Sequence, residues 1–429
     1  MSRIRKRRRL AASLACPSRI QLLETRQLLA AAVMAPNPAS DAGVIFQPSE
    51  ISTEAKLLKS PDIGSAAMPI TSGVVQVAVS RGGDIVITGD AEQNFVAVQF
   101  TNGSLQVSGW SSGTLIRSGN RAPVDSVTVP LPNGVRSLWV SLGEGNDTLR
   151  LAFKSNLTIS RDVSINLGNG ADFMDVSVAG SAVRTGRDLS IDFAGGNDRA
   201  VVGLYETGTL ISNRDIRVRG GLGDDSLLVQ AFGAITSDAL SSPTLFRQIQ
   251  NNSDQADSQP LRARRDLIVD LGVGDDRVTL LGAEAGRDVS VFAGIGTDAI
   301  TTSNVRSGRG MRMFDAESVA MQNVTVVGLL NFRSGMGDDR AVLDRISVGR
   351  MEIDLAGGND RLVLGETISV KTVAFIDGGS GSNSTNSETP LKGYSVRRLV
   401  PDLTDVQELE ILSTILTASP QPSIEIQST

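Results

Sequence analysis

Eight short turns, each ending in an aspartate, are the features of this chain whose residue types and spacing could support chemistry. Six follow the pattern Gly-x-Gly-x-Asp and two read Ala-Gly-Gly-Asn-Asp; their last residues are Asp147, Asp172, Asp198, Asp225, Asp276, Asp298, Asp339 and Asp360. Carboxylate and backbone carbonyl oxygens are the ligands that Ca²⁺ takes. Aspartate also accepts hydrogen bonds from backbone amides in tight turns without a metal. The turns therefore predict either a row of calcium sites or a metal-free structural corner.

The spacing of these aspartates indicates a repeat. Successive intervals are 25, 26, 27, 51, 22, 41 and 21 residues, so one unit takes about 21–27 residues and two intervals are close to double length. An Arg-Asp pair keeps its aspartate ten residues before the turn aspartate in five copies, at Asp162, Asp188, Asp215, Asp266 and Asp288. A rigid unit followed by a variable loop explains the fixed distance, and such a period is typical of a solenoid.

Apolar residues alternate on both sides of the turns, and this period of two predicts strands with one buried face. Leu189, Ile191 and Phe193 precede one turn, and Leu362 and Leu364 follow another. Stacked units bury a continuous apolar column that one unit cannot close alone. We expect an all-β fold, a right-handed parallel β-helix or β-roll solenoid with coils of about 21–27 residues. An antiparallel sandwich is the alternative.

Composition divides the rest of the chain. Residues 1–36 carry eight basic residues against Glu24 alone, a net charge of +7, which leaves −13 for the remainder of a chain whose total is −6. We expect residues 1–36 to be an export leader and 37–72 a linker. Residues 73–390 would form the solenoid with an exposed loop at 237–263, and 391–429 a C-terminal cap and polar tail.

Two resemblances carry further expectations. Residues 23–29, Leu-Glu-Thr-Arg-Gln-Leu-Leu, resemble the LEPR-x-LL motif of exported bacterial surface proteins, with Thr25 in place of proline. The turns resemble the RTX (hemolysin-type) calcium-binding nonapeptide GGxGxDxUx, which residues 220–225 match at all six turn positions. The first resemblance implies a signal peptide and secretion to the cell surface. The second implies Ca²⁺ as a cofactor, held by the eight turn aspartates.

Composition also narrows the function. The chain has no histidine and one cysteine, Cys16, so a His- or Cys-based catalytic or zinc site is excluded. The acidic body argues against nucleic acid as a partner. The chain contains no run of 18 apolar residues, so the sequence predicts no transmembrane helix. We expect a non-enzymatic structural or adhesive surface protein, with a cell-envelope or extracellular-matrix component as partner. The alternative is an extracellular polysaccharide lyase or hydrolase, although the two tryptophans, Trp110 and Trp139, and the two tyrosines, Tyr205 and Tyr394, are expected to fill core or turns.

Overall fold

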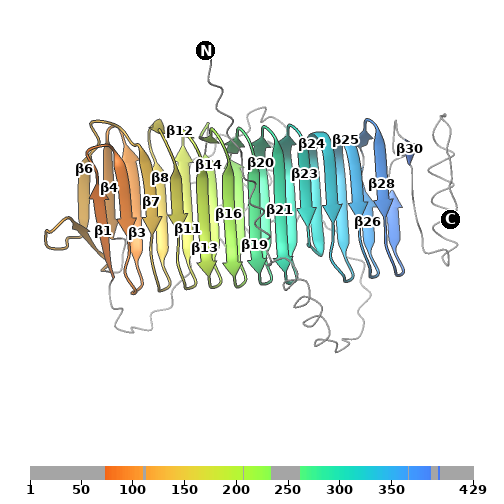
Figure 1. Cartoon of the computed structure of the whole chain (residues 1–429), viewed down its shortest axis with the longest axis horizontal. Coiled ribbons are helices and arrows are strands. Elements are labelled where there is room, and N and C mark those ends of the chain that lie inside the picture. The colour runs from red at the N-terminus through yellow and green to blue at the C-terminus, as the bar shows by residue number, and fades with distance from the viewer. Residues whose placement is uncertain are drawn as a thin grey trace, which may run out of the picture. The chain divides into compact units, whose positions relative to one another are not determined.

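The computed structural model describes residues 73–109, 113–205, 207–232, 261–365, 367–387 and 395–396. These residues form β-strands and turns and contain no helix, so none of them forms an apolar helix that could cross a membrane. The predicted leader at 1–36, the linker at 37–72, and all of the predicted cap and tail at 391–429 except Ser395 and Val396 lie outside the described residues. The prediction of an all-β solenoid is confirmed: the strands join in one mostly parallel stack (Figure 1).

Each full coil supplies three strands, one before the Gly-rich turn, one after it, and a short third one. The strands before the turn are β2 (Asp84–Thr88), β7 (Ser137–Ser141), β10 (Val163–Asn166), β13 (Leu189–Gly195), β16 (Ile216–Leu222), β19 (Leu267–Val273), β21 (Asp288–Ile295), β23 (Gly310–Phe314) and β28 (Val373–Asp377). The strands after it are β3 (Phe95–Thr101), β8 (Thr148–Phe153), β11 (Phe173–Ala179), β14 (Arg199–Tyr205), β17 (Ser226–Phe232), β20 (Arg277–Ala285), β22 (Ala299–Ser307), β26 (Arg361–Leu364) and β29 (Ser384–Ser387). The third strands are β9 (Leu157–Ile159), β12 (Ala182–Thr185), β15 (Thr209–Ser212), β18 (Leu261–Ala263) and β27 (Ile368–Val370), while β24 (Ser318–Arg333) and β25 (Arg340–Asp354) run through all three positions.

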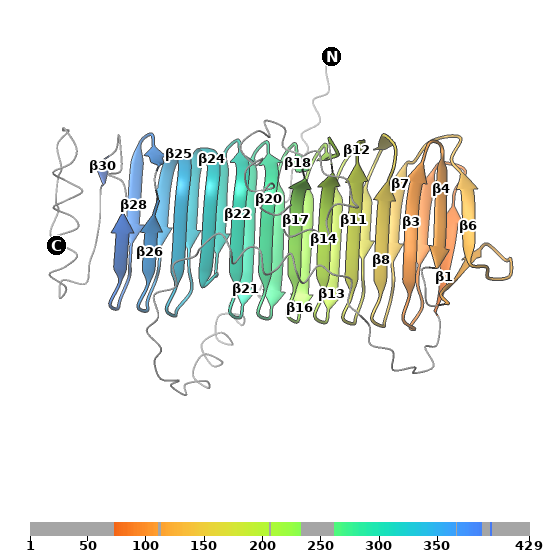
Figure 2. The same cartoon turned by 180° about the vertical axis from the view of Figure 1, so that it is seen from behind.

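Equivalent strands of neighbouring coils pair in parallel and in register, as both views of the stack show (Figure 1, Figure 2). Val163 pairs with Leu189, which pairs with Ile216, so equivalent residues of the repeat face one another. β30 (Ser395–Val396) continues this order on β28. Because parallel strands lie about 4.8 Å apart, every residue type that repeats in the sequence becomes a straight row along the stack.

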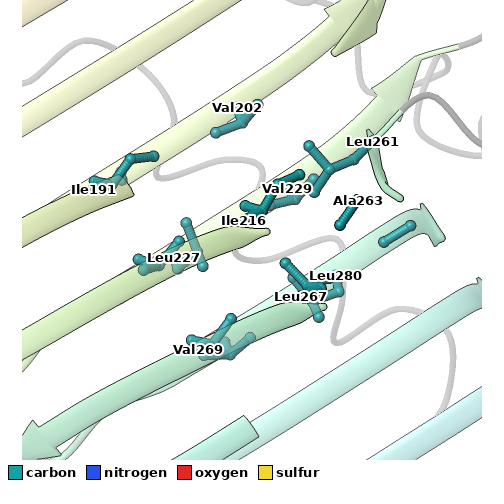
Figure 3. Packing of buried hydrophobic residues seen from close by; sticks show 14 of the residues in the cluster. Ile191, Val202, Ile216, Leu227, Val229, Leu261, Ala263, Leu267, Val269 and Leu280 are labelled. Carbon is teal, nitrogen blue, oxygen red and sulfur yellow. The ribbon is translucent and has the colours of Figure 1, made fainter. Parts of the chain in front are cut away.

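The core is a column of aliphatic side chains from the inward positions of these strands. Ile191, Ile216 and Leu227 are buried to 3% exposure or less and belong to the cluster in Figure 3. A small apolar cavity of about 30 Å³ lies among such residues. Burying one such side chain stabilises a fold by roughly 1.5–3 kcal/mol, and the fully buried Phe100, Phe193 and Phe332 belong to the same column.

Trp139 lies on the outside of the solenoid. In β7 it stands between the buried Leu138 and Val140 and is 40% exposed. The prediction that this tryptophan fills core or a turn is therefore wrong.

The first part of the solenoid is irregular. β1 (Val74–Val79) pairs antiparallel with β2, and β4 (Ser104–Gly109) pairs antiparallel with β3 and with β6 (Ser126–Pro130), while β5 (Leu115–Ser118) lies parallel to β1. This antiparallel meander occupies the N-terminal end of the described stack (Figure 1). The parallel repeat therefore starts with β2 and β3, close to the predicted start at residue 73.

The two long intervals have different causes. The 41-residue interval is two coils, because Ala299 pairs with Ser318 and Ser318 with Arg340. The 51-residue interval is one coil, because Ile216 pairs directly with Leu267. Reading both as doubled coils was therefore wrong for the second, which holds an insertion instead. Of the loop predicted at 237–263, residues 237–260 lie outside the described residues, whereas residues 261–263 form β18 with Leu261 and Ala263 buried.

Candidate functional site: the aspartate file

The glycine turns bring successive coils into backbone contact. In the turn before Asp298, the N–H of Gly274 donates to Ile295 of the next coil at 2.9 Å, and Gly296 has a φ of +155°. A Cβ on Gly296 would lie 1.7 Å from the carbonyl oxygen of Gly274. Only glycine fits both the backbone angle and the close approach, so the turn sequence follows from stacking itself.

The turn aspartates lie directly behind these glycines, inside the corner. All eight are 1–3% exposed. In seven of them Oδ1 accepts the backbone N–H of the corresponding residue one coil earlier: Asn94 to Asp147 (2.7 Å), Asp147 to Asp172 (2.7 Å), Asp172 to Asp198 (2.7 Å), Asp198 to Asp225 (3.0 Å), Asp225 to Asp276 (2.7 Å), Asp276 to Asp298 (2.8 Å) and Asp339 to Asp360 (2.9 Å). We call this row the aspartate file. Each of these seven thus links its coil to the coil before it, whereas neither side-chain oxygen of Asp339 has a hydrogen bond among the described residues.

Three further residues belong to the file. The sequence marks Asn94, which follows Asp84 by ten residues as the turn aspartates follow the Arg-Asp pairs, whereas Glu317 and Asn383 were missed. Asn94 starts it, and Glu317 bridges the gap between Asp298 and Asp339 by accepting the N–H of Asp298 through Oε2. Asn383 ends it, with Oδ1 2.9 Å from the N–H of Asp360. Asn383 follows Gly379 and Gly381 at the spacing of the other turns, so allowing asparagine in the last position finds it. Glu317 gives no such signal, because its turn lacks the glycines.

The second carboxylate oxygen of each turn aspartate has no partner. Oδ2 of all eight is buried and makes no hydrogen bond with the described residues, and none of the eight forms an ion pair with them. A buried polar group without a partner is costly, and a buried charge more so. The file therefore holds a straight row of oxygens that favour either a proton or a cation.

Burial accordingly raises the pKa of these carboxyl groups, against the opposing effect of the N–H bond and with help from neighbouring carboxylates. The pKa rises to about 6 at Asp172, Asp276 and Asp339, to about 7 at Asp147, Asp198 and Asp298, and to about 8 at Asp225, and it is also raised at Asp360. Two ionised neighbours about 4.8 Å apart would repel by roughly 3–4 kcal/mol at an effective dielectric constant near 20. At neutral pH the file is therefore partly protonated.

The Arg-Asp pairs form a second ladder with a different counter-charge. Asp215 donates its N–H to Asp188 of the preceding coil at 3.1 Å, so the bonds run opposite to those of the file. In four of the five pairs the arginine contacts the aspartate one coil earlier, as Arg287 does with Asp266 at 3.0 Å, and Arg309, which is followed by Gly310, contacts Asp288 in the same way. The hydrogen bond from Arg309 lowers the pKa of Asp288. These arginines therefore neutralise their own ladder and not the aspartate file.

A third, exposed row lies one residue before the file. Oδ1 of Asn197 accepts the N–H of Asp224 at 3.0 Å, and Oδ1 of Asp224 accepts that of Asp275 at 2.9 Å. Its carboxylates add to the negative potential at the corner, and Asp224 is one cause of the raised pKa of Asp225. The corner thus holds a buried and an exposed acidic row side by side.

The oxygen atoms that the file offers are of the type that Ca²⁺ binds, but they are fewer than the ligands it takes. Ca²⁺ takes six to eight oxygen ligands, and the file offers hard carboxylate oxygens, with one unpartnered Oδ2 per coil. Among the described residues, no three acidic side chains converge on one point. An arginine directly follows the turn aspartate in four copies, and these side chains, Arg199, Arg277, Arg340 and Arg361, are half-buried or exposed.

Comparison with known proteins finds no match among protein-family models, curated proteins or solved structures.

Proposed function

We propose that this chain is a secreted or cell-surface structural protein, a rod built as a right-handed parallel β-helix with coils of about 21–27 residues, that displays its outer faces for adhesion. The single observation that carries the proposal is that the aspartate file joins neighbouring coils. In seven turn aspartates, Oδ1 accepts the backbone N–H of a residue in the neighbouring coil. The turn aspartate, the reactive residue that repeats most often along the chain, therefore serves to hold neighbouring coils together.

The geometry gives less support to the lyase or hydrolase alternative. General acid–base catalysis needs a few groups that converge on one substrate atom, whereas these acidic groups form rows along the whole stack. The cavity given above lies inside the apolar column and has no acidic lining residue. The export of the rod rests on the LEPR-x-LL-like segment at residues 23–29.

Calcium binding at the file is a second candidate, and the row of unpartnered Oδ2 atoms favours it. A divalent cation there would neutralise two carboxylates and remove the repulsion between coils. At such a site Oδ2 would bind the cation, as in an RTX-like turn, while Oδ1 keeps its hydrogen bond to the neighbouring coil. The most acidic stretch of the file is where Asp225 and Asp276 lie beside the exposed Asp224 and Asp275.

Thermal unfolding of the full chain tests both ideas. The structural proposal predicts that the unfolding temperature responds to pH and is the same in EDTA as in 5 mM CaCl₂, a concentration above the dissociation constant of about 0.1–1 mM expected of extracellular sites. A rise with CaCl₂ that MgCl₂ does not reproduce would establish the calcium site. Protease treatment of intact cells tests surface display. Release of shortened oligosaccharides from envelope polysaccharides by purified protein would replace the structural proposal with the enzymatic one.

A further inference from the structure

One turn of the stack is three residues shorter than the turns on either side of it. Strand pairing before and after the corner fixes the count: the turn holds six residues in one coil, 293–298, three in the next, 315–317, and six again in the coil after, 334–339. The short turn lacks the glycines and carries Glu317 in the place of a turn aspartate. The two full turns beside it are therefore two strand spacings apart, about 10 Å.

The short turn leaves open the space between the full turns at 293–298 and 334–339, which we call the corner gap. Elsewhere a Cβ on a turn glycine would overlap a carbonyl oxygen of the preceding coil, as it would at Gly296. A Cβ on Gly335 would instead have only Oε1 of Glu317 within 4 Å, at 4.0 Å, and one on Gly337 only Oδ1 of Asp339, at 3.9 Å, apart from adjacent residues. Two carboxylate groups therefore border the space that backbone fills at other corners.

The carboxylates at the corner gap lack donors. Asp339 is 2% exposed, and neither of its oxygens makes a hydrogen bond with the described residues, because the hydroxyl of Ser334 donates to Leu355 at 3.0 Å instead. Glu317 uses Oε2 for the N–H of Asp298, and its Oε1 makes no hydrogen bond with the described part of the chain. Burial, and the charges of neighbours that include Glu317, raise the pKa of Asp339 to about 6. Three acceptor oxygens thus lie close together without a partner.

The surroundings of the corner gap are acidic, and its rim is apolar. Residues 293–299, 314–318 and 333–340, the three turns with their flanking residues, hold five acidic and two basic side chains. One of the two basic residues, Arg333, forms an ion pair with Asp354 at 2.8 Å. The third residue of each full turn is apolar and exposed, Ile295 at 57% and Met336 at 90%. A ligand that fits the gap therefore combines a positive charge with an apolar stem.

We infer that the corner gap binds a lysine side chain of a partner polypeptide, with its methylene stem between Ile295 and Met336 and its ammonium group on Glu317 and Asp339. An ammonium group has three N–H donors, one for each unpartnered oxygen, and a lysine stem packs on apolar groups while its head reaches a charge. The missing turn leaves one strand spacing, about 4.8 Å, which admits a single methylene chain.

A metal ion fits the gap less well. Two carboxylates supply fewer ligands than the six to eight that Ca²⁺ takes, and no third acidic side chain of the described residues joins them. The inference names one contact between the proposed surface rod and its partner, and its biological meaning rests on that proposal.

Methyl NMR of the full-length protein, labelled at its methionine methyl groups, tests the inference at the rim of the gap. Met336 is exposed, whereas the other methionines of the described residues, Met174, Met311, Met313, Met321 and Met351, are at most 1% exposed, and Met336→Leu assigns its signal. Titration with Nα-acetyl-lysine methylamide in EDTA should shift the Met336 signal to saturation. The norleucine derivative, which has the same stem without the charge, should not, and the arginine derivative should bind more weakly.

Substitutions locate the contact. Glu317→Gln and Asp339→Asn should each weaken binding of the lysine derivative about tenfold, as expected for losing a hydrogen bond to a charged group. The matched control Asp225→Asn removes the same charge at a stacked corner and should bind as the wild type does.

Four results would overturn the inference: no saturable shift with the lysine derivative, equal binding of the arginine or norleucine derivative, equal weakening by Asp225→Asn, or unchanged binding by both Glu317→Gln and Asp339→Asn. Displacement of the lysine derivative by 1 mM CaCl₂, but not by NaCl of the same ionic strength, would assign the gap to calcium instead. None of these results affects the pH response of unfolding or surface display, which test the proposed rod separately.

Discussion

Replacing Asp225 by asparagine should make the rod less sensitive to pH. Asparagine keeps an oxygen for the N–H of Asp198, 3.0 Å away, and removes the ionisable group. The pKa of Asp225 is raised to about 8, from an ordinary value of 3.8, by burial and by neighbouring carboxylates. The substitution therefore removes a charge that the folded state resists and leaves the bond between coils in place.

The sign and size follow from proton linkage. Below pH 3.8 the carboxyl group is protonated in both states and costs nothing. Between that value and pH 8 the unfolded chain releases the proton while the folded chain keeps it, so stability falls by about 1.4 kcal/mol per pH unit. The loss levels off above pH 8 at about 6 kcal/mol as an upper bound. The Asp225→Asn variant should gain on the wild type across that window.

Unfolding followed by circular dichroism between pH 4 and 9, in EDTA, measures this difference. The amide nitrogen introduced at Oδ2 adds an offset that does not change with pH, so the slope and not the absolute difference carries the test. A difference in unfolding free energy that stays constant within about 0.5 kcal/mol over the whole range would refute the protonated file. In excess CaCl₂, a variant that becomes less stable than the wild type would favour the calcium reading.

Four other substitutions, one of them a control, probe the same architecture by urea unfolding. Asp288→Asn removes the partner of Arg309 and should lower the free energy of unfolding by about 1 kcal/mol at neutral pH. Because the pKa of Asp288 is lowered, this stabilisation is present above its ordinary pKa of 3.8 and is lost as pH falls, the opposite of the file. A larger loss in acid than at neutral pH would contradict this reasoning. Gly296→Ala should lower the free energy of unfolding by more than about 3 kcal/mol, because its Cβ would lie 1.7 Å from a backbone oxygen. The control Gly103→Ala, whose Cβ would have no atom within 4 Å, should lower it by about 1–2 kcal/mol from its positive φ alone. Equal losses would contradict the close stacking of the coils. Ala194→Gly should stabilise by up to about 1 kcal/mol, since Ala194 has a φ of +71°, and a loss would show that its methyl group packs.

The sequence predicted the repeat well because its information is local. Alternation around Leu189 and Ile191 places both residues in the core, and the fixed distance from Asp188 to Asp198 marks one strand and its turn. The eight turn aspartates were expected to share one corner, and seven of them are joined through backbone amides. The calcium expectation at those residues stays untested by the geometry.

The features that the sequence did not predict are those that depend on which coil stacks on which. The interval between Asp225 and Asp276 looks like two coils in the sequence, and only the pairing of Ile216 with Leu267 shows that it is one. The charge state of the file was equally hidden, because it depends on whether Oδ2 faces solvent or the core. Only the structure shows that the arginines of the repeat serve the second ladder and not the file, as Arg265 does by contacting Asp215 at 3.5 Å.

The two ladders solve the same problem of repeated carboxylates in ways that their burial dictates. At the Arg-Asp ladder, a guanidinium such as that of Arg287 stays 43% exposed while it reaches Asp266. At the file, burial to 1–3% leaves the neutralisation to a proton or a small cation. As pH rises, Asp172 and Asp276, with pKa values of about 6, should ionise before Asp225, at about 8. By the linkage given above, the contacts at those two positions should stop weakening near pH 6, whereas the contact at Asp225 should go on weakening up to about pH 8. Relative to the intrinsic exchange rate, hydrogen exchange of the Asp198 amide, which donates to Asp225, should therefore keep quickening above pH 6, where that of the Asp147 and Asp225 amides, which donate to Asp172 and Asp276, no longer does.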